Sequence, residues 1–187
     1  GTGYEQGVQD DIDVYFATFA KSMAGIGAFL AGDKDVIQFL QYNMRSQMFA
    51  KTLPMAMVKG ALKRLDMIRT MPELKDKLWQ NTNSLQSGLR SAGFDLGTTE
   101  TCITPVFLKG EVPEAMALVH DLRENHGVFC SIVVYPVIPK GLIILRLIPT
   151  ATHTQEDIDE TITAFSAIRD LLENGTYKKM AASIMAE

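Results

Sequence analysis

The chain has 187 residues, 47% of them hydrophobic, which is enough for one large domain or two small ones with a buried core. Eighteen basic and 22 acidic residues give a formal net charge of −4, a composition without a nucleic-acid footprint or a basic membrane patch. No apolar run reaches the roughly 20 residues that span a bilayer, and we expect no signal peptide. Cys102 and Cys130 lack the spacing of a metal site, so each is expected to be a buried thiol in a reducing, cytoplasmic compartment.

The first regular structure is expected at about 12–19, where an apolar, aromatic-rich run predicts a buried strand. A second strand is expected at about 28–31, after a glycine-containing loop. Lys21 stands at the mouth of the first strand, beside hydroxyl residues. A desolvated lysine amine in such a place forms an imine with an aldehyde readily. The alternative is an ordinary surface lysine on a strand–loop–strand turn.

Residues 33–95 show helical spacing. A helix is expected after Asp33, a plausible N-cap, followed by a break at 46–53. Pro54 suits the first turn of a second helix. A third, long helix is expected to begin near Pro72 and to end at Gly93.

From Cys102 onward the pattern alternates strand and helix and predicts a small, mostly antiparallel α+β domain. Strands are expected at 103–108, 128–135 and 142–148, with a helix at 113–125 and a loop at 136–141. Thr154 with Asp157 is typical of an N-terminal cap, and the helix that follows should end near Gly175. Residues after Tyr177 are expected to be frayed or loosely helical.

One short motif and five further segments in order resemble the α-oxoamine synthases, a family of pyridoxal phosphate (PLP) enzymes. The family includes serine palmitoyltransferase, glycine C-acetyltransferase, 8-amino-7-oxononanoate synthase and 5-aminolevulinate synthase. The lysine motif is Thr18-Phe19-Ala20-Lys21-Ser22 followed by Gly25-Ile26-Gly27. The other matching segments are Leu53-Pro54, Leu78-Trp79-Gln80-Asn81, Gly93-Phe94-Asp95-Leu96-Gly97, Tyr135-Pro136-Val137-Ile138-Pro139-Lys140-Gly141 with Leu145-Arg146, and Thr152-His153-Thr154.

The resemblance implies an α/β fold that forms the C-terminal part of a type I PLP-dependent transferase. Residues 1–52 would be the end of the PLP-binding large domain, 53–95 linking helices, and 96–187 a small α+β domain with an antiparallel sheet. Members of the family carry a long stretch upstream of the lysine. We therefore expect the chain to be the carboxy-terminal half of such an enzyme, inactive by itself.

For the cofactor, the resemblance implies that Lys21 is catalytic: it would bind PLP as an imine and then move the α-proton of the substrate. Thr18 would donate a hydrogen bond to the phosphate; alternatively it is a strand-end threonine that bonds the backbone. Ala50 stands where the family has a phosphate-binding hydroxyl from the neighbouring subunit, so either Thr52 or backbone amides near Ala50 would replace it. Thr52 as a helix N-cap is the alternative.

For the substrate, the resemblance implies that Arg146 holds the α-carboxylate through its bidentate guanidinium. The alternative is an exposed arginine on an edge strand. Val137 would border the substrate, whereas His153 is expected to be structural. No residue pattern supports a metal site.

The implied activity is a decarboxylating condensation of an amino acid with an acyl-CoA, giving an aminoketone, CoA and CO2. The motifs favour L-serine and a long-chain acyl-CoA, with glycine C-acetyltransferase or 8-amino-7-oxononanoate synthase activity as alternatives. A homodimer with shared active sites is expected. A hypothesis of a different class is a non-catalytic fragment that only folds or dimerises.

Overall fold

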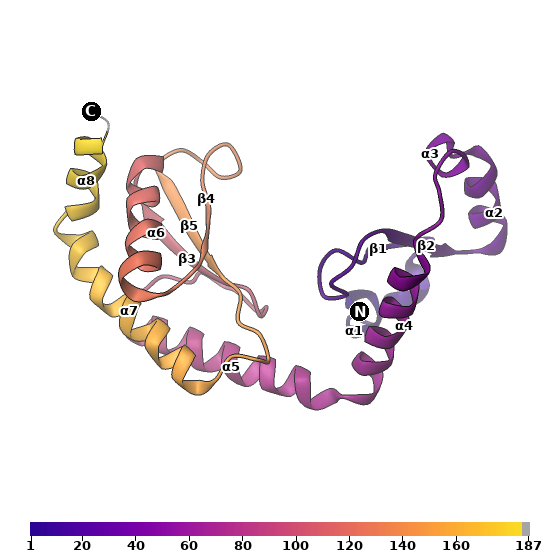
Figure 1. The fold of residues 1–187 in the computed structure, drawn as a ribbon, viewed down its shortest axis with the longest axis horizontal. Helices are drawn as coiled ribbons and strands as arrows, with labels where there is room; N and C mark the ends of the chain where they lie inside the picture. Colours follow the sequence, from indigo (N-terminus) through magenta and orange to yellow (C-terminus); the bar gives the residue numbers. More distant parts are fainter. Residues whose placement is uncertain (185–187) are drawn as a thin grey trace. The chain divides into compact units, whose positions relative to one another are not determined.

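The computed structural model describes residues 1–184, and its backbone divides into two units, Gly1–Pro72 and Glu73 onward. The first unit holds a two-stranded sheet and short and medium helices (Figure 1). Its elements are α1 (Thr2–Glu5), the 3-10 helix η1 (Gln9–Asp11), β1 (Val14–Thr18), β2 (Ala28–Gly32), α2 (Lys34–Asn43), α3 (Arg45–Met48) and α4 (Met55–Thr70). The division of the chain at 52 and 95 stays a prediction.

The strands β1 and β2 form an antiparallel pair in which Val14 lies opposite Gly32 and Thr18 opposite Ala28. The expectation of a buried strand is wrong for this chain: Phe16 is 65% exposed, and every residue of β2 is exposed. Within the first unit only Gly3 is buried. Two strands and the flanking helices do not supply a second layer that covers both faces of the pair.

The helices of the first unit follow the expected order, with two corrections. Asp33 is the N-cap residue of α2, although its side chain makes no capping hydrogen bond. The expected break at 46–53 begins with the short helix α3. Pro54 is the N-cap of α4 and not part of its first turn, so Thr52 is not the N-cap either.

The second unit is a small α+β domain (Figure 1). Its sheet has the order β3-β5-β4, and both strand pairs are antiparallel. β4 is shorter than the expected 128–135 because pairing with β5 covers only three residues. The elements are α5 (Pro72–Ser91), β3 (Thr104–Lys109), α6 (Val112–His126), β4 (Ser131–Val133), β5 (Leu142–Leu147), α7 (Gln155–Glu173) and α8 (Thr176–Ile184).

The hydrophobic core lies between the sheet and the helices α5, α6 and α7. Burial alternates along β5: Ile143, Leu145 and Leu147 face the core, whereas Leu142 and Arg146 are exposed. This alternation follows from the two-residue period of a strand. It assigns Arg146 to the open face of the sheet.

The ends of helices α6 and α7 lie where the sequence predicts them. Gly127 ends α6 in the left-handed conformation with φ 68°, and Thr154 with Asp157 forms the capping box of α7. Of the two expectations after Tyr177, a frayed end is wrong over the described residues, whereas a helix is present to Ile184. The α8 helix packs on α6, and Tyr177 and Ala181 are buried.

No helix within residues 1–184 has the length and apolar character needed to cross a membrane.

Candidate active site

Lys21 lies in an ordered loop that joins β1 to β2. The Phe19 amide donates to the Gly27 carbonyl at 2.8 Å, and the Gly25 amide donates to the Phe19 carbonyl at 2.7 Å. The Lys21 carbonyl accepts from the Ala24 amide at 2.8 Å. Gly27 adopts φ 99°, a conformation that glycine reaches without strain. The backbone of the loop is therefore fixed by its own hydrogen bonds.

The side chain of Lys21 is exposed, so its expected burial is wrong for this chain. Leu53 lies against Gly27 of the loop and the Arg64 guanidinium lies near Gly25, but Lys21 and its neighbours Ala20 and Ser22 stay exposed. No hydrogen bond or ion pair of the Lys21 amine is formed with any residue of the described part of the chain. An amine without such a partner is free for covalent bonding.

Thr18 is engaged with the backbone of the same loop. Its hydroxyl donates to the Gly27 carbonyl and accepts from the Ala20 amide, both at 3.2 Å. This is the arrangement of a strand-end threonine. To donate to a phosphate, the hydroxyl would have to give up the Gly27 carbonyl, since it has a single proton.

The loop at 49–54 carries Ala50 and Thr52, which are both exposed. Its Leu53 lies against the lysine loop of the same chain: a Cβ added at Gly27 would lie 2.9 Å from Leu53 Cδ2. Close approach by Leu53 thus depends on glycine at position 27. The structure brings the Leu-Pro segment next to the lysine loop, while a cross-subunit role of Ala50 or Thr52 stays a prediction.

Arg146 lies on β5, the central strand of the sheet, so the alternative of an edge-strand arginine is wrong. The side chain is exposed on the open face, where its Nε donates to Ser131 Oγ of β4 at 3.1 Å. Val137, in the loop between β4 and β5, is also exposed. Both residues belong to the second unit, while Lys21, Thr18, Ala50 and Thr52 belong to the first.

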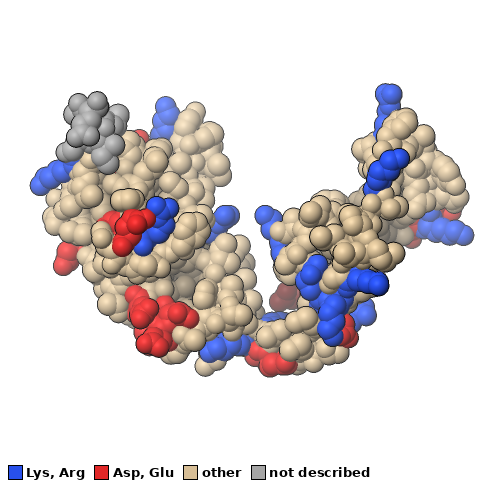
Figure 2. All heavy atoms as spheres, viewed as in Figure 1, with Lys and Arg blue, Asp and Glu red and all other residues tan. Residues whose placement is uncertain are grey.

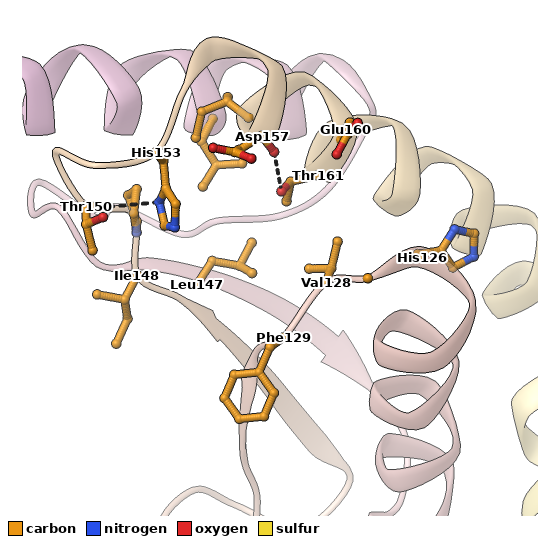
Figure 3. Close-up of a pocket in the computed structure, with 14 residues that line it drawn as sticks. His126, Val128, Phe129, Leu147, Ile148, Thr150, His153, Asp157, Glu160 and Thr161 are labelled. Atoms are coloured by element: carbon orange, nitrogen blue, oxygen red, sulfur yellow. Dashed lines mark hydrogen bonds between the residues drawn. The ribbon is translucent and has the colours of Figure 1, made fainter.

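The second unit also has a hollow of 470 Å³ beside the turn that follows β5 (Figure 3). His153 Nδ1 accepts from the Thr150 amide at 3.1 Å, which agrees with the expected structural role of this histidine. Hydrogen bonds from the backbone and side chain of Thr154 hold the pKa of Asp157 below its usual value. Arg146 and Val137 do not line this hollow.

Sequence reasoning missed the polar residues that hold the turn after β5. Asn81 of α5 is fully buried, and its Nδ2 donates to the carbonyls of Thr150 at 2.9 Å and His153 at 2.8 Å. Asn81 shares the buried stripe of α5 with Leu85 and Leu89, four residues apart in each step. A polar residue on an apolar stripe is the signal that could have revealed it.

Among residues 1–184, no group of three or more His, Cys, Asp and Glu side chains is placed to hold a metal ion.

The sequence matches the family described as aminotransferase class I and II over residues 2–165. The chain belongs to that family. The resemblance drawn from the motifs and the expected α/β fold of a PLP-dependent transferase are thereby confirmed.

Two curated relatives carry the names of acyltransferases. The chain is 66% identical over 187 residues to "Cysteate-C-fatty acyltransferase" of Capnocytophaga ochracea, covering 100% of this chain and 44% of the relative. It is 40% identical over 162 residues to "Serine palmitoyltransferase" of Sphingobacterium spiritivorum, covering 87% of this chain and 40% of the relative. The chain thus spans less than half the length of the relatives that it matches.

Solved structures of serine palmitoyltransferase superpose on the backbone. Serine palmitoyltransferase of Sphingomonas wittichii superposes with a TM-score of 0.84 at 28% identity, covering 92% of this chain and 43% of that chain. A serine palmitoyltransferase structure that contains PLP superposes with a TM-score of 0.83 at 29% identity, covering 92% and 44%.

Proposed function

We propose that this chain is part of a PLP-dependent acyltransferase that joins a fatty acyl group from acyl-CoA to the α-carbon of cysteate, with loss of CO2. The observation that carries the proposal is the 66% identity, over all 187 residues, to a relative named for cysteate and fatty acyl transfer. The motifs, which favour a long-chain acyl-CoA, support the same class of acyl donor.

The lysine loop fits PLP because its amine is exposed and unpaired within the described chain. Lys21 Nζ would hold the cofactor's aldehyde carbon. Thr18, Thr52 and backbone amides near Ala50 are the candidate donors to its phosphate, although the Ala50 amide itself donates to the Gln47 carbonyl at 3.3 Å. When bound, PLP supplies the electron sink that stabilises negative charge on the amino acid's α-carbon.

Two residues of the chain would act on the amino acid. Lys21 Nζ, once released, would take the α-proton as a general base. Arg146 would hold the α-carboxylate through paired N–H groups and so orient the bonds of the α-carbon, while Val137 would border the substrate. By orienting the α-carbon, Arg146 would determine which of its bonds breaks first. The bond to hydrogen would break before the bond to the carboxylate, so that deprotonation would precede the loss of CO2.

L-Serine is the second candidate acceptor, because the motifs favour it and a relative named serine palmitoyltransferase is 40% identical. Serine and cysteate differ in charge, since the cysteate side chain ends in an anionic sulfonate. A homodimer with shared active sites is part of the proposal, as is the inactivity of the 187-residue chain alone.

The test uses the full-length enzyme with PLP and palmitoyl-CoA, supplied with L-cysteate, L-serine or glycine in parallel. Mass spectrometry of the aminoketone and release of CO2 are measured. We expect kcat/KM to be highest for L-cysteate. If kcat/KM is highest for serine or glycine, that amino acid is the acceptor in place of cysteate. If none of the three amino acids gives a product, the proposed reaction is overturned.

A second measurement tests the cofactor residue by itself. Lys21→Ala should abolish the visible absorption band of the bound cofactor, whereas Lys34→Ala, an exposed lysine of α2, should keep it. A band that survives Lys21→Ala would remove Lys21 from the site.

A further inference from the structure

Arg146 has one hydrogen-bond partner in the described part of the chain, Ser131. The two residues lie directly opposite each other in the antiparallel β4–β5 pair, so their side chains leave the sheet on the same face. In the β3–β5 pair, on the other side of β5, Pro105 lies opposite Arg146, and its side chain has no polar atom. Ser131 is therefore the one lateral hydrogen-bonding side chain beside this arginine.

The geometry leaves both Nη groups of the guanidinium, four of its five N–H donors, available. Nε donates to Ser131 Oγ at 3.1 Å, and the two Nη groups make no hydrogen bond or ion pair within residues 1–184. A carboxylate can bind a guanidinium across the Nη pair or along its Nε edge. The Ser131 contact occupies the Nε edge.

An exposed arginine with apolar neighbours has many rotamers of similar energy. The residues two positions away along the chain are Ile144 of β5 and Ile148 just after its end, whose side chains offer no hydrogen bond to Arg146. Fixing such a side chain in one orientation costs rotamer entropy. A hydrogen bond that already holds Nε removes part of this cost before the substrate binds.

We propose that Ser131 is a positioning residue that holds Arg146 by its Nε so that the two Nη groups receive the substrate carboxylate end-on. This inference rests on the proposed function, because it assigns the carboxylate to Arg146. Ser131 touches neither substrate nor cofactor in this arrangement. Its effect passes through the orientation of the guanidinium.

The experiment compares Ser131→Ala with Ser131→Thr, which keeps the hydroxyl, in the full-length enzyme loaded with PLP. The affinity for L-cysteate is measured by titration, with the absorbance of the cofactor as the signal. The affinity for taurine is measured in the same way, because taurine has the amine and the sulfonate of cysteate but no carboxylate. We expect Ser131→Ala to weaken L-cysteate binding about 3- to 10-fold, the loss of one hydrogen bond. Taurine binding and the KM for palmitoyl-CoA should change less than about twofold, and Ser131→Thr should restore the affinity.

Ser166→Ala is the matched control, because it removes a serine hydroxyl that donates to the Ile162 carbonyl within α7, outside the sheet. It should leave both affinities unchanged. Equal weakening of L-cysteate and taurine by Ser131→Ala would show a merely structural role and overturn the inference, as would unchanged L-cysteate binding.

Arg146→Ala separates this inference from the proposed function. If Arg146→Ala leaves L-cysteate affinity intact, the carboxylate site itself is elsewhere and both proposals about Arg146 fail. If Arg146→Ala weakens L-cysteate but Ser131→Ala does not, only the role of Ser131 fails. In the Arg146→Lys background, which lacks Nε, Ser131→Ala should add no further loss.

Discussion

Cys130 lies at the entry to β4 with 3% of its surface exposed, and burial raises the pKa of its thiol to about 11. Cys102 is half-buried, so the expectation of a buried thiol is confirmed for Cys130 and wrong for Cys102. Only the thiolate attacks a disulfide reagent. The two thiols should therefore differ in reactivity.

We expect one thiol of the folded 187-residue chain to react with a disulfide reagent at pH 8 and the second only after addition of urea. The reason is that only about one in a thousand Cys130 side chains is ionised at that pH. Cys102→Ser should remove the fast phase and Cys130→Ser should keep it. Two equal rates in the folded chain would contradict this prediction.

Gly27 closes the lysine loop with φ 99°, and a Cβ added there would lie 2.9 Å from Leu53 Cδ2. Gly27→Ala should cost about 1–3 kcal/mol of local backbone strain and move the loop that carries Lys21. We expect the full-length enzyme to lose PLP affinity, measured by cofactor absorbance at increasing dilution. Gly7→Ala is the matched control, since φ is 70° there and no atom lies within 4 Å of the added Cβ. Equal loss of PLP in both variants would contradict a local effect.

At the scale of elements, α8 shows what periodicity does not reveal. Tyr177 is 2% exposed, and its hydroxyl donates to a carboxylate oxygen of Asp121 on α6. Burial disfavours the charged form of Asp121, but hydrogen bonds from Tyr177 and Asn125 and the nearby His126 and His120 outweigh it, so its pKa lies below the usual value. The helix docks through this bond as well as through apolar contacts.

Tyr177→Phe should destabilise the second unit by about 1–2 kcal/mol at neutral pH, because it removes a hydrogen bond to a partly exposed charged group. The contribution of Asp121 is present above its ordinary pKa and is lost as pH falls through the lowered value. The difference between wild type and Tyr177→Phe should thus be full at pH 6 and shrink below about pH 4. Urea unfolding across this range checks it, and a difference that is constant with pH would speak against ionised Asp121 as the acceptor.

At the scale of the whole molecule, the two units differ in how much they bury. The hydrophobic core belongs to the second unit, where Leu89, Leu145 and Phe165 are buried completely or nearly so. In the first unit many apolar side chains, Phe16 and Phe49 among them, are exposed. Uncharged side chains also cover most of the surface visible in Figure 2. Burial of apolar surface is the main stabilising term of a fold.

We expect residues 73–187 produced alone to unfold in one cooperative urea transition, and residues 1–72 produced alone to show none. Circular dichroism and the dispersion of amide proton resonances are the measurements. A cooperative transition in residues 1–72 would contradict the interpretation that this unit lacks a core of its own.

The helices α5 to α7 and the strands β3 and β5 could be predicted from the sequence because their signals are local. Gly127 and the Thr154–Asp157 pair mark helix ends through their own backbone and side-chain chemistry. The lysine motif and Arg146 could be singled out for the same reason, as residue types at fixed spacing. The pairing of Ser131 with Arg146 could not, since it depends on the register of two strands joined by a loop.

The sequence by itself determined the family, the helical and strand periods and the identity of the candidate site residues, because each is written in short-range patterns. Only the tertiary structure decided the central place of β5, the docking of α8 and the exposure of Lys21. Burial depends on which distant segments cover a residue. An apolar run such as that of β1 indicates residues that are more stable when buried, but it does not show whether other segments of the chain bury them.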